Sequence, residues 1–412
     1  MKTAFYNLTF RGLAVLGRFL ILIGIGKYLT IEDLGIYGLF YTSVIISIYI
    51  IGFDFYTYNT RELIAAKSNQ RLHLIFDQFI FHGAFYVILL PALLSIFFMD
   101  IIPINYIYLF YLVLIFEHLS QELYRVFTAL KKTVFANFIS FIKTGLWVYI
   151  LFFLWYSDFN QLKNLDTVFV LWFGGASISV LISIIYITKL KLGKIKDYKI
   201  NNDWILQGIK ISVPFFVSSL AYKIVEFSNR YFIDFFRDKS EVGIFTFYSG
   251  IANLINVIVF TAVIMIYYPK LYDYYINNKS ELYKKAVNQF SLLVITISLS
   301  IAVILVFGIP ILLNIINKSE IYDQYLNVYY ILIVANVILN ISLIPHYIMY
   351  VKKKDKLIMN ITVAGAIFNL IFNYIFIQIW GLSGVAISSV ISFFIIFILK
   401  FYYRRDTEIA GI

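Results

Sequence analysis

Six basic side chains lie inside stretches that otherwise have the apolar composition of membrane-spanning helices. They are Arg11, Arg18, Arg125, Lys143, Lys223 and Arg230. A charge in the middle of a bilayer is costly, so such residues usually face a protein-lined cavity that holds water. Arg11 and Arg18 are seven residues apart, as are Lys223 and Arg230, and seven residues make almost two turns of an α-helix. Each pair therefore lies along one helix face, and the six residues together predict a basic interior suited to an anionic ligand.

Acidic residues accompany one of these pairs. On the seventh expected helix, Lys223, Glu226, Arg230 and Asp234 follow one another at spacings of three, four and four, which places them on one stripe. In one interpretation these charges neutralise one another between packed helices. In the other, the basic groups bind an anion while the acids tune or release them. The two are compatible, because a charge inside the membrane usually pairs in the resting state.

A second group of acids lies on the fourth expected helix. Glu117 and Glu122 precede Arg125 there, and these acids are candidates for relaying protons or holding a cation. Lys143, on the fifth expected helix, either pairs with one of these acids or contributes to the basic interior. Asp54, near the inner end of the second expected helix, is a further acidic candidate.

The composition identifies a polytopic membrane protein. Of the 412 residues, 61% are hydrophobic and only 14% are charged, and the mean hydropathy is +0.83; soluble domains have about 25% charged residues. Cysteine is absent and the four histidines show no metal-ligand spacing, so we expect no metal site and no cofactor. The motifs of serine hydrolases, nucleotide-binding loops and zinc proteases are also absent, so we do not expect an enzyme.

Twelve helices are expected, each near the roughly 20 residues that a bilayer requires. They cover residues 8–29, 34–56, 76–98, 104–127, 134–156, 166–188, 208–232, 242–268, 287–315, 325–350, 357–379 and 382–402. With the N-terminus in the cytoplasm, most of the 34 lysines and arginines fall in cytoplasmic loops, as the positive-inside rule requires. The sequence thus predicts an all-α membrane protein with both termini in the cytoplasm. The same loops explain the net charge of +11 without a nucleic-acid partner.

The longest inner loop, at residues 189–207, divides the chain into two halves of six helices, which we expect to form domains 1–200 and 201–412. A weak internal similarity supports this division. Leu34–Ile36 reads Leu-Gly-Ile after an acidic pair, and Val242–Ile244 reads Val-Gly-Ile after Glu241, in each case at the second helix of a half. Internal repeats are common in secondary transporters, whose substrate sites lie where the repeats meet.

Several segments resemble the polysaccharide-transporter branch of the multidrug/oligosaccharidyl-lipid/polysaccharide (MOP) exporter superfamily, which includes the Wzx-type flippases of O-antigen and capsule repeat units. The most specific segments are residues 365–377 and 380–388. More degenerate patterns lie at 29–39, 52–54, 61–63, 212–219, 229–230 and 242–245, so the resemblance covers the whole chain.

The resemblance implies a V-shaped bundle of two six-helix lobes that alternates between inward-open and outward-open states. It implies that undecaprenyl-diphosphate-linked oligosaccharides are moved from the cytoplasmic to the outer leaflet of the bacterial cytoplasmic (inner) membrane, for O-antigen, capsule or lipopolysaccharide synthesis. In the family, basic cavity residues hold the diphosphate and anionic sugars, and Arg18 and Arg230 match these positions best. Many relatives have an Asp-Arg pair where this chain has Asn229-Arg230, so the acidic partner is missing there unless Glu226 replaces it.

The resemblance also implies protein partners and possible energy sources for the transport cycle. A polysaccharide polymerase and chain-length proteins are expected partners, and protons, sodium ions or the membrane potential are the alternatives for driving the cycle. Because the cell interior is negative, moving one negative charge outward gains about 2.3 kcal/mol per 100 mV.

Two other classes of function are open from the residues alone. A MATE-type drug or organic-cation antiporter of the same fold would have an acidic, aromatic cavity, and Asp54, Glu117, Glu122 and Glu226 keep that alternative open. A membrane polymerase or acyltransferase would carry a sizeable external loop or paired catalytic residues. The expected outer loops are short, the longest covering residues 157–165, which disfavours the enzyme class.

Overall fold

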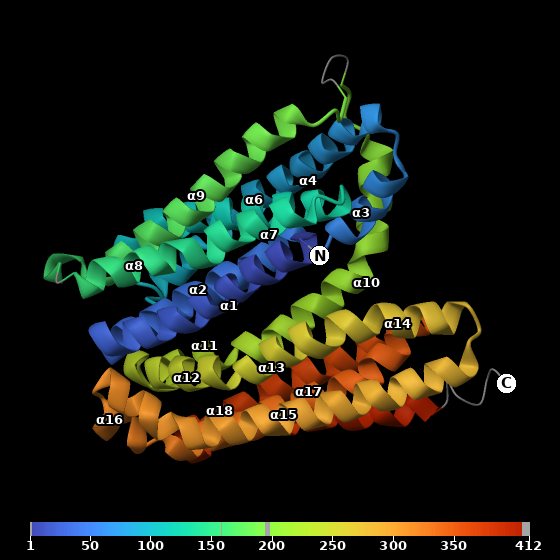
Figure 1. Ribbon diagram of the computed structural model, residues 1–412. Coiled ribbons are helices and arrows are strands. Elements are labelled where there is room, and N and C mark those ends of the chain that lie inside the picture. The colour runs from blue at the N-terminus through green and yellow to red at the C-terminus, as the bar shows by residue number, and fades with distance from the viewer. Residues whose placement is uncertain (1, 158, 194–197, 406–412) are drawn as a thin grey trace. The chain divides into compact units, whose positions relative to one another are not determined.

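The computed structural model describes residues 2–157, 159–193 and 198–405, and every regular element within these ranges is helical (Figure 1). The prediction of an all-α fold is thereby confirmed. The chain forms two compact units, Met1–Leu220 and Ala221–Ile412, and the division falls within helix α10 (Asn202–Phe227). Residues 194–197 of the expected inner loop and both chain ends lie outside the described ranges, so the cytoplasmic placement of the termini stays a prediction.

The first unit is built from nine helices and the beginning of α10. They are α1 (Lys2–Tyr28), α2 (Ile31–Gly52), α3 (Tyr56–Ala65), α4 (Arg71–Ala92), α5 (Leu94–Phe98), α6 (Ile107–Ala129), α7 (Thr133–Phe141), α8 (Trp147–Tyr156) and α9 (Leu165–Lys189).

Contacts in the first unit fix the directions of its helices. Asn7 contacts Thr133 and Arg11 contacts Asn137, so α1 and α7 run parallel. Ser120 contacts Ser179 and Phe127 contacts Tyr186, so α6 is parallel to α9. Phe135 contacts Tyr186 and Trp147 contacts Trp172, so α7 and α8 are antiparallel to α9. The beginnings of α1 and α7 and the end of α9 therefore lie at one end of this unit. The close approach of α1 requires a glycine, because a Cβ atom on Gly17 would lie 2.8 Å from the Cα atom of Gly145.

The second unit contains the end of α10 and eight further helices. They are α11 (Asn229–Phe236), α12 (Lys239–Ala252), α13 (Leu254–Val259), α14 (Met265–Ile276), α15 (Ser280–Ile316), α16 (Ser319–Asp323), α17 (Leu326–Val351) and α18 (Asp355–Arg405). Ring contacts pair Tyr248 with Tyr329 and Tyr268 with Tyr347, so α12–α14 run parallel to α17. Tyr267 contacts Phe290 and Tyr275 contacts Tyr283, so α14 and α15 are antiparallel. Directions that alternate in this way are those of consecutive membrane crossings.

Helix α18 is a hairpin of two arms that meet at Gly381, whose backbone is non-helical (φ 57°, ψ −135°). Asn369 on the first arm donates a hydrogen bond to Ser392 on the second at 3.2 Å, and Gly365 faces Ile396. The arms are therefore antiparallel, and they correspond to the separate helices expected at 357–379 and 382–402.

Ten helices among the described residues are long and apolar enough to span a membrane, with both arms of α18 counted as one. Helix α6 has 23 residues but is not among the ten, and it carries the charged residues Glu117, Glu122 and Arg125. The joint counting of the two arms of α18 and the omission of α6 account for the difference from the twelve spans expected from the sequence. The protein is a multi-pass membrane protein, and the count of twelve stays a prediction.

Several expected helices are interrupted: the one expected at 76–98 is divided at Leu93, and the one expected at 34–56 ends at Gly52. The helix expected at 208–232 is divided at Ser228, so Lys223 and Glu226 lie on α10 whereas Arg230 and Asp234 lie on α11. The expected single charged stripe is thus divided between two helices. The helices expected at 134–156 and 242–268 each contain one π-helical turn, at Ile142–Leu146 and Phe260–Ile264.

The repeated sequence pattern has the same local structure in both units. The Thr30 hydroxyl accepts a hydrogen bond from the Asp33 amide at the start of α2, and the Asp238 carboxylate accepts one from the Glu241 amide at the start of α12. Each cap satisfies a backbone donor that the first helical turn leaves unpaired. The Leu-Gly-Ile and Val-Gly-Ile segments that follow are buried in their own units.

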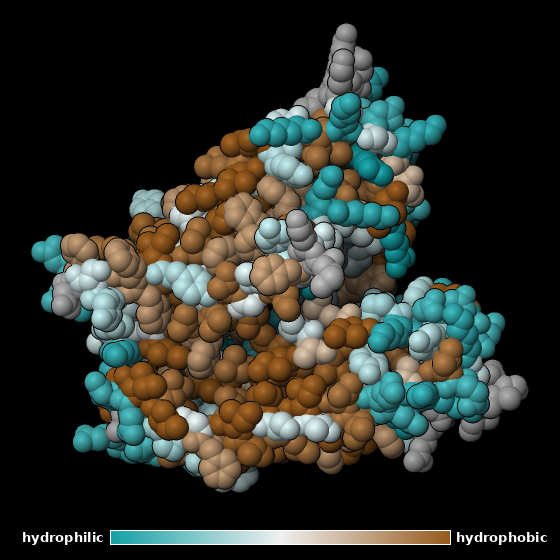
Figure 2. Space-filling view, in the orientation of Figure 1, coloured by the Kyte–Doolittle hydropathy of each residue, from teal (hydrophilic) through white to brown (hydrophobic). Residues whose placement is uncertain are grey.

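Hydrophobic residues cover the middle of the helices, and hydrophilic residues gather near their ends (Figure 2). In the second unit this pattern is clear along α15, whose brown surface is bounded by teal at both ends (Figure 2). Such a band is the surface expected of helices that contact the hydrocarbon of a bilayer.

Candidate functional site

Helix α6 places a row of polar side chains in the interior of the first unit. Glu117, His118 and Glu122 are buried, and the Arg125 side chain is only 16% exposed. The spacings of four and three put His118, Glu122 and Arg125 on one face, whereas Glu117 lies on an adjoining face. The row therefore contacts two different sets of neighbours.

Glu117 contacts α9 and the π-helical turn. Its Oε1 atom is 2.7 Å from Lys143 Nζ, and its Oε2 atom accepts a hydrogen bond from Trp172 Nε1 at 3.1 Å. Lys143 lies in the turn Ile142–Leu146, and π-helical interruptions are frequent at functional sites. Of the two roles expected for Lys143, pairing with an acid is the one present in the structure.

Glu122 is the centre of a second buried set. It forms an ion pair with Arg125, and its Oε2 atom accepts a hydrogen bond from Gln78 Nε2 at 2.6 Å. Gln78 is itself hydrogen-bonded to Asn59. A buried ion pair is tolerated when further hydrogen bonds satisfy the remaining polar atoms, and Gln78 supplies one here.

The guanidinium of Arg125 has an aromatic contact as well as an acidic one. It lies 3.7 Å from the ring centroid of Tyr56 and interacts electrostatically with Asp54. Asp54 is buried and follows the end of α2 in the left-handed conformation, with φ 48°. The predicted candidates Asp54, Glu122 and Arg125 therefore belong to one cluster.

Two histidines extend this cluster. The rings of His82 on α4 and His118 on α6 lie 4.8 Å apart, and Tyr86 Oη is 2.7 Å from His118 Nδ1. His118 Nε2 is 3.8 Å from Glu122 Oε1. Within the described ranges, no group of three histidine or acidic side chains is arranged to hold a metal ion.

The sequence interpretation missed Gln78 and His82, although a signal was present. Gln78, His82 and Tyr86 recur every four residues in α4, so they share one face. A polar stripe on a membrane helix indicates a partner inside the protein, and here that partner is α6.

The two arginines of α1, Arg11 and Arg18, lie in different environments. Arg11 Nε donates a hydrogen bond to Asn137 Oδ1 at 2.9 Å on the neighbouring α7. Arg18 is exposed, and with the described residues it forms no hydrogen bond or ion pair. It lies near the middle of the span Phe5–Tyr28, far from either end.

The charged residues of the second unit have separate partners. Lys223 Nζ lies 2.7 Å from Glu226 Oε2, so the acid that could have replaced the missing aspartate contacts Lys223. Arg230 is buried, and it donates hydrogen bonds to Thr246 Oγ1 at 3.0 Å and Ser249 Oγ at 2.9 Å. Both hydroxyls belong to α12, so Arg230 joins α11 to α12.

Neutral side chains fill the interface of α11 with α18. Asn373 Nδ2 donates hydrogen bonds to Asn229 Oδ1 at 2.7 Å and to Asn369 Oδ1 at 3.0 Å, and Asn369 also accepts one from Ser228. The sequence interpretation used Asn229 but not this network. It also missed buried Lys400, whose Nζ lies 3.2 Å from His346 Nδ1.

Comparisons with known proteins agree with this architecture. Residues 1–274 match the family described as "Polysaccharide biosynthesis protein". No curated protein matches the sequence. Among solved structures, an inward-facing multidrug resistance MATE family transporter of the MOP superfamily is similar, with a TM-score of 0.74, 16% identity, and coverage of 98% of this chain and 94% of that one.

Two further structures are similar at the same low level of identity. An outward-facing multidrug resistance MATE family transporter has a TM-score of 0.68 at 15% identity, covering 98% of this chain and 94% of that one. A MATE protein in complex with MaD3S has a TM-score of 0.68 at 16% identity, covering 97% and 94%. At such identities the likeness concerns the fold, while the family match covers more than half of the chain. The chain therefore belongs to the polysaccharide biosynthesis protein family, and it has the fold of the MATE transporters of the MOP superfamily.

Proposed function

We propose that this transporter moves a lipid-linked oligosaccharide with an anionic diphosphate linkage, of the undecaprenyl-diphosphate type, across the bacterial cytoplasmic membrane. The direction is from the cytoplasmic to the outer leaflet, for the synthesis of a surface polysaccharide such as O-antigen or capsule. The family match to polysaccharide biosynthesis supports the saccharide, and the transporter fold supports the translocation.

One observation carries the anionic part of the proposal, and it is the environment of Arg18. An exposed guanidinium halfway along a membrane-spanning helix is costly unless water or an anion surrounds it. Arg125, Lys143 and Lys223 differ from it, because each has a carboxylate partner. Arg18 is therefore the basic residue that we expect to contact the diphosphate first, and Arg230 is the second candidate.

The proposal is tested by deleting the gene in its host and restoring it as wild type, Arg18→Ala, Arg18→Lys or Lys27→Ala. Lipid-linked oligosaccharide and surface polysaccharide are measured together, with the amount of each variant in the membrane as the check on folding. We expect deletion and Arg18→Ala to accumulate the lipid-linked precursor on the cytoplasmic face and to lose surface polysaccharide. Arg18→Lys keeps the charge and should retain part of the activity.

Lys27→Ala is the matched control, because Lys27 is an exposed basic residue at the end of the same helix. We expect it to behave as wild type. Unchanged polysaccharide in the deletion strain, together with new sensitivity to cationic dyes, would reject the proposal and favour the MATE-type antiporter.

We also propose that the α6 cluster couples transport to proton movement. Glu117 and Glu122 are buried carboxylates that each hold one basic partner, so protonation of either acid would release Lys143 or Arg125 from its ion pair. A change of charge inside a packed bundle alters the packing of the helices that carry it.

The coupling proposal is tested in proteoliposomes under a proton gradient, a sodium gradient or a potential alone. We expect the wild type to respond to the proton gradient and Glu117→Gln to lose that response while retaining exchange without a gradient. The exposed residue Glu32, changed to Gln, is the control. A response of the wild type to sodium but not to the proton gradient, or an equal response of Glu117→Gln and the wild type to the proton gradient, would contradict proton coupling without affecting the substrate proposal.

A further inference from the structure

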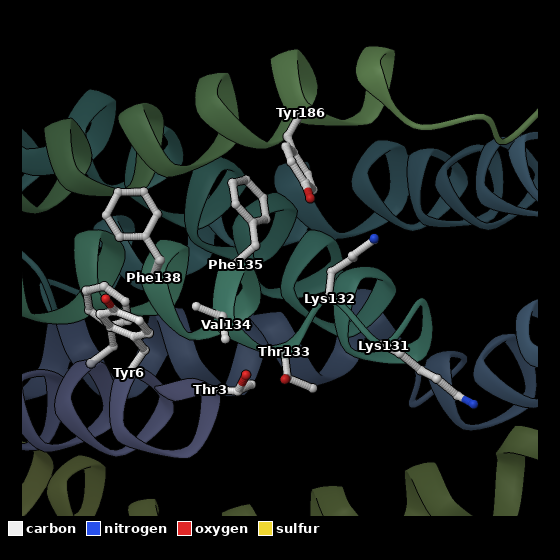
Figure 3. A pocket seen from close by; sticks show the side chains of 10 residues that line it. Thr3, Tyr6, Lys131, Lys132, Thr133, Val134, Phe135, Phe138 and Tyr186 are labelled. Carbon is white, nitrogen blue, oxygen red and sulfur yellow. The ribbon is translucent and has the colours of Figure 1, made fainter. Parts of the chain in front are cut away.

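The first unit has a groove at the end where α1 and α7 begin and α9 finishes. Its volume is about 570 Å³, which is within the usual range for small-ligand sites. Figure 3 shows the side chains that line it, which come from these three helices and from the turn before α7. None of the groups in the α6 cluster lines this groove, so it is distinct from the candidate site above.

The chemistry of the groove changes along its length. Lys131 and Lys132 lie at one end, in the turn that precedes α7, and both are exposed. Phe135 and Phe138 follow on successive turns of α7, and Figure 3 shows Phe138 and Tyr6 at the end far from Lys131. The groove is therefore basic at the helix ends and aromatic further along the helices.

The aromatic wall is held in place by ring contacts. Phe135 stacks on Tyr186 with centroids 3.9 Å apart, and Phe10 contacts Phe138 edge-to-face at 5.4 Å. Packing of this kind keeps the wall preformed, so a ligand would not have to order it.

At the basic end of the groove the backbone is held in place, while the lysine side chains can contact a ligand. Lys131 is left-handed, with φ 60°, and the Lys132 amide donates a hydrogen bond to the Phe127 carbonyl at 2.8 Å. Within the part of the chain that the structure describes, neither ammonium group has a hydrogen bond or ion pair. The two charges are thus presented at the groove without an acid to neutralise them.

We propose that this groove binds an anionic phospholipid of the surrounding leaflet. Because the groove lies at the common end of three membrane helices, its lysines are placed at the depth of lipid headgroups, and its aromatic wall extends toward the hydrocarbon. The phosphate contacts Lys131 and Lys132, and one acyl chain lies along Phe135 and Phe138. Two ammonium groups complement the net negative charge of an anionic headgroup, whereas the phosphate of a zwitterionic lipid is balanced by its own cation.

The test is lipid retention by the full chain, purified in mild detergent with equal amounts of phosphatidylglycerol and phosphatidylcholine and measured by native mass spectrometry. We expect the wild type to retain phosphatidylglycerol preferentially, and Lys131→Gln/Lys132→Gln to reduce this retention about tenfold. Phe138→Ala should weaken the retention without changing the preference for charge. Thermal unfolding of each variant in detergent checks that the fold is kept.

The matched control is Lys353→Gln/Lys354→Gln. These residues are also adjacent exposed lysines before a helix, and Lys353 is left-handed with φ 56°. Equal losses in the two double variants, or equal retention of the two lipids by the wild type, would overturn the proposal. Displacement of the lipid by millimolar inorganic phosphate would identify a free-anion site instead, and stronger displacement by undecaprenyl diphosphate would identify a substrate site; either result would reject the phospholipid.

Discussion

The two units place polar groups inside apolar bundles in different ways. In the first unit the buried polar groups include two ion pairs, Glu117–Lys143 and Glu122–Arg125. At the α11–α18 interface of the second unit they are neutral amides and hydroxyls, centred on Asn369 and Asn373. The helix starts at α2 and α12 have the same capping geometry, so the two repeats differ most in their interiors.

The neutral amide network and the ion pairs differ in how they respond to a change of pH. A neutral amide network holds helices together at any physiological pH, because none of its members titrates there. An ion pair inside the membrane is sensitive to the gain of a single proton, because protonating the acid leaves the base without its counter-charge. The ion pairs of the first unit are thus suited to respond to ions, and the amide network of the second unit is suited to maintain a fixed packing.

The largest expected effect comes from breaking a charge pair in the first unit. Glu122→Ala leaves Arg125 buried without its ion-pair partner, which should lower the free energy of unfolding by about 3–5 kcal/mol. Thermal unfolding of the purified protein in detergent would measure this loss. The double variant Glu122→Met/Arg125→Met removes both charges and should recover most of the stability. If the double variant is no more stable than the single one, the destabilisation comes from lost packing rather than from an unpaired charge.

A smaller effect is expected from the neutral network of the second unit. Asn369→Ala removes hydrogen bonds to Ser392 and Asn373, and we expect a loss of about 0.6–2 kcal/mol. The same unfolding measurement applies, repeated at several pH values, because the loss should not vary between mildly acidic and neutral pH. A loss as large as that of Glu122→Ala would remove the contrast between the two interiors.

Breaking the half-buried charge pair of the second unit should lower the stability less. Glu226→Gln removes the negative charge beside Lys223, and both side chains are partly exposed, at 25% and 17%. We expect a change in stability below about 1 kcal/mol. Salt titration of the wild type is the companion measurement, since an exposed pair is screened and a buried one is not. A loss of several kcal/mol would show that this pair resembles those of the first unit.

The smallest effect on stability is expected from Tyr198, which lies outside the membrane-spanning segments. Burial, and then the hydrogen bond to Asp77, raises the pKa of Tyr198 above its ordinary value near 10. The folded state therefore favours the protonated phenol, and this contribution is complete below about pH 10 and is lost as the pH rises toward the raised pKa. Tyr198→Phe should unfold with a weaker pH dependence than the wild type at alkaline pH. Tyr156→Phe, at an 84% exposed position, is the control.

The sequence was sufficient to predict the helical fold and the polar character of α6, because apolar segment length and charge spacing are local signals. It placed Arg11 and Arg18 on one face, but it could not show that Asn137 would bind only one of them. Contacts such as Glu117 with Trp172 join residues that are 55 positions apart, and they depend on how helices pack. The break at Ser228 and the π-helical turn around Lys143 also arise from packing, and helical periodicity contains no sign of either.

The turn at Gly381 has a consequence for how the protein is made. The arms of α18 are joined by one non-helical residue and are linked across their interface by Asn369, so neither arm has a loop that would let it enter the membrane separately. We therefore expect these two spans to leave the translocon as one preassembled helical pair.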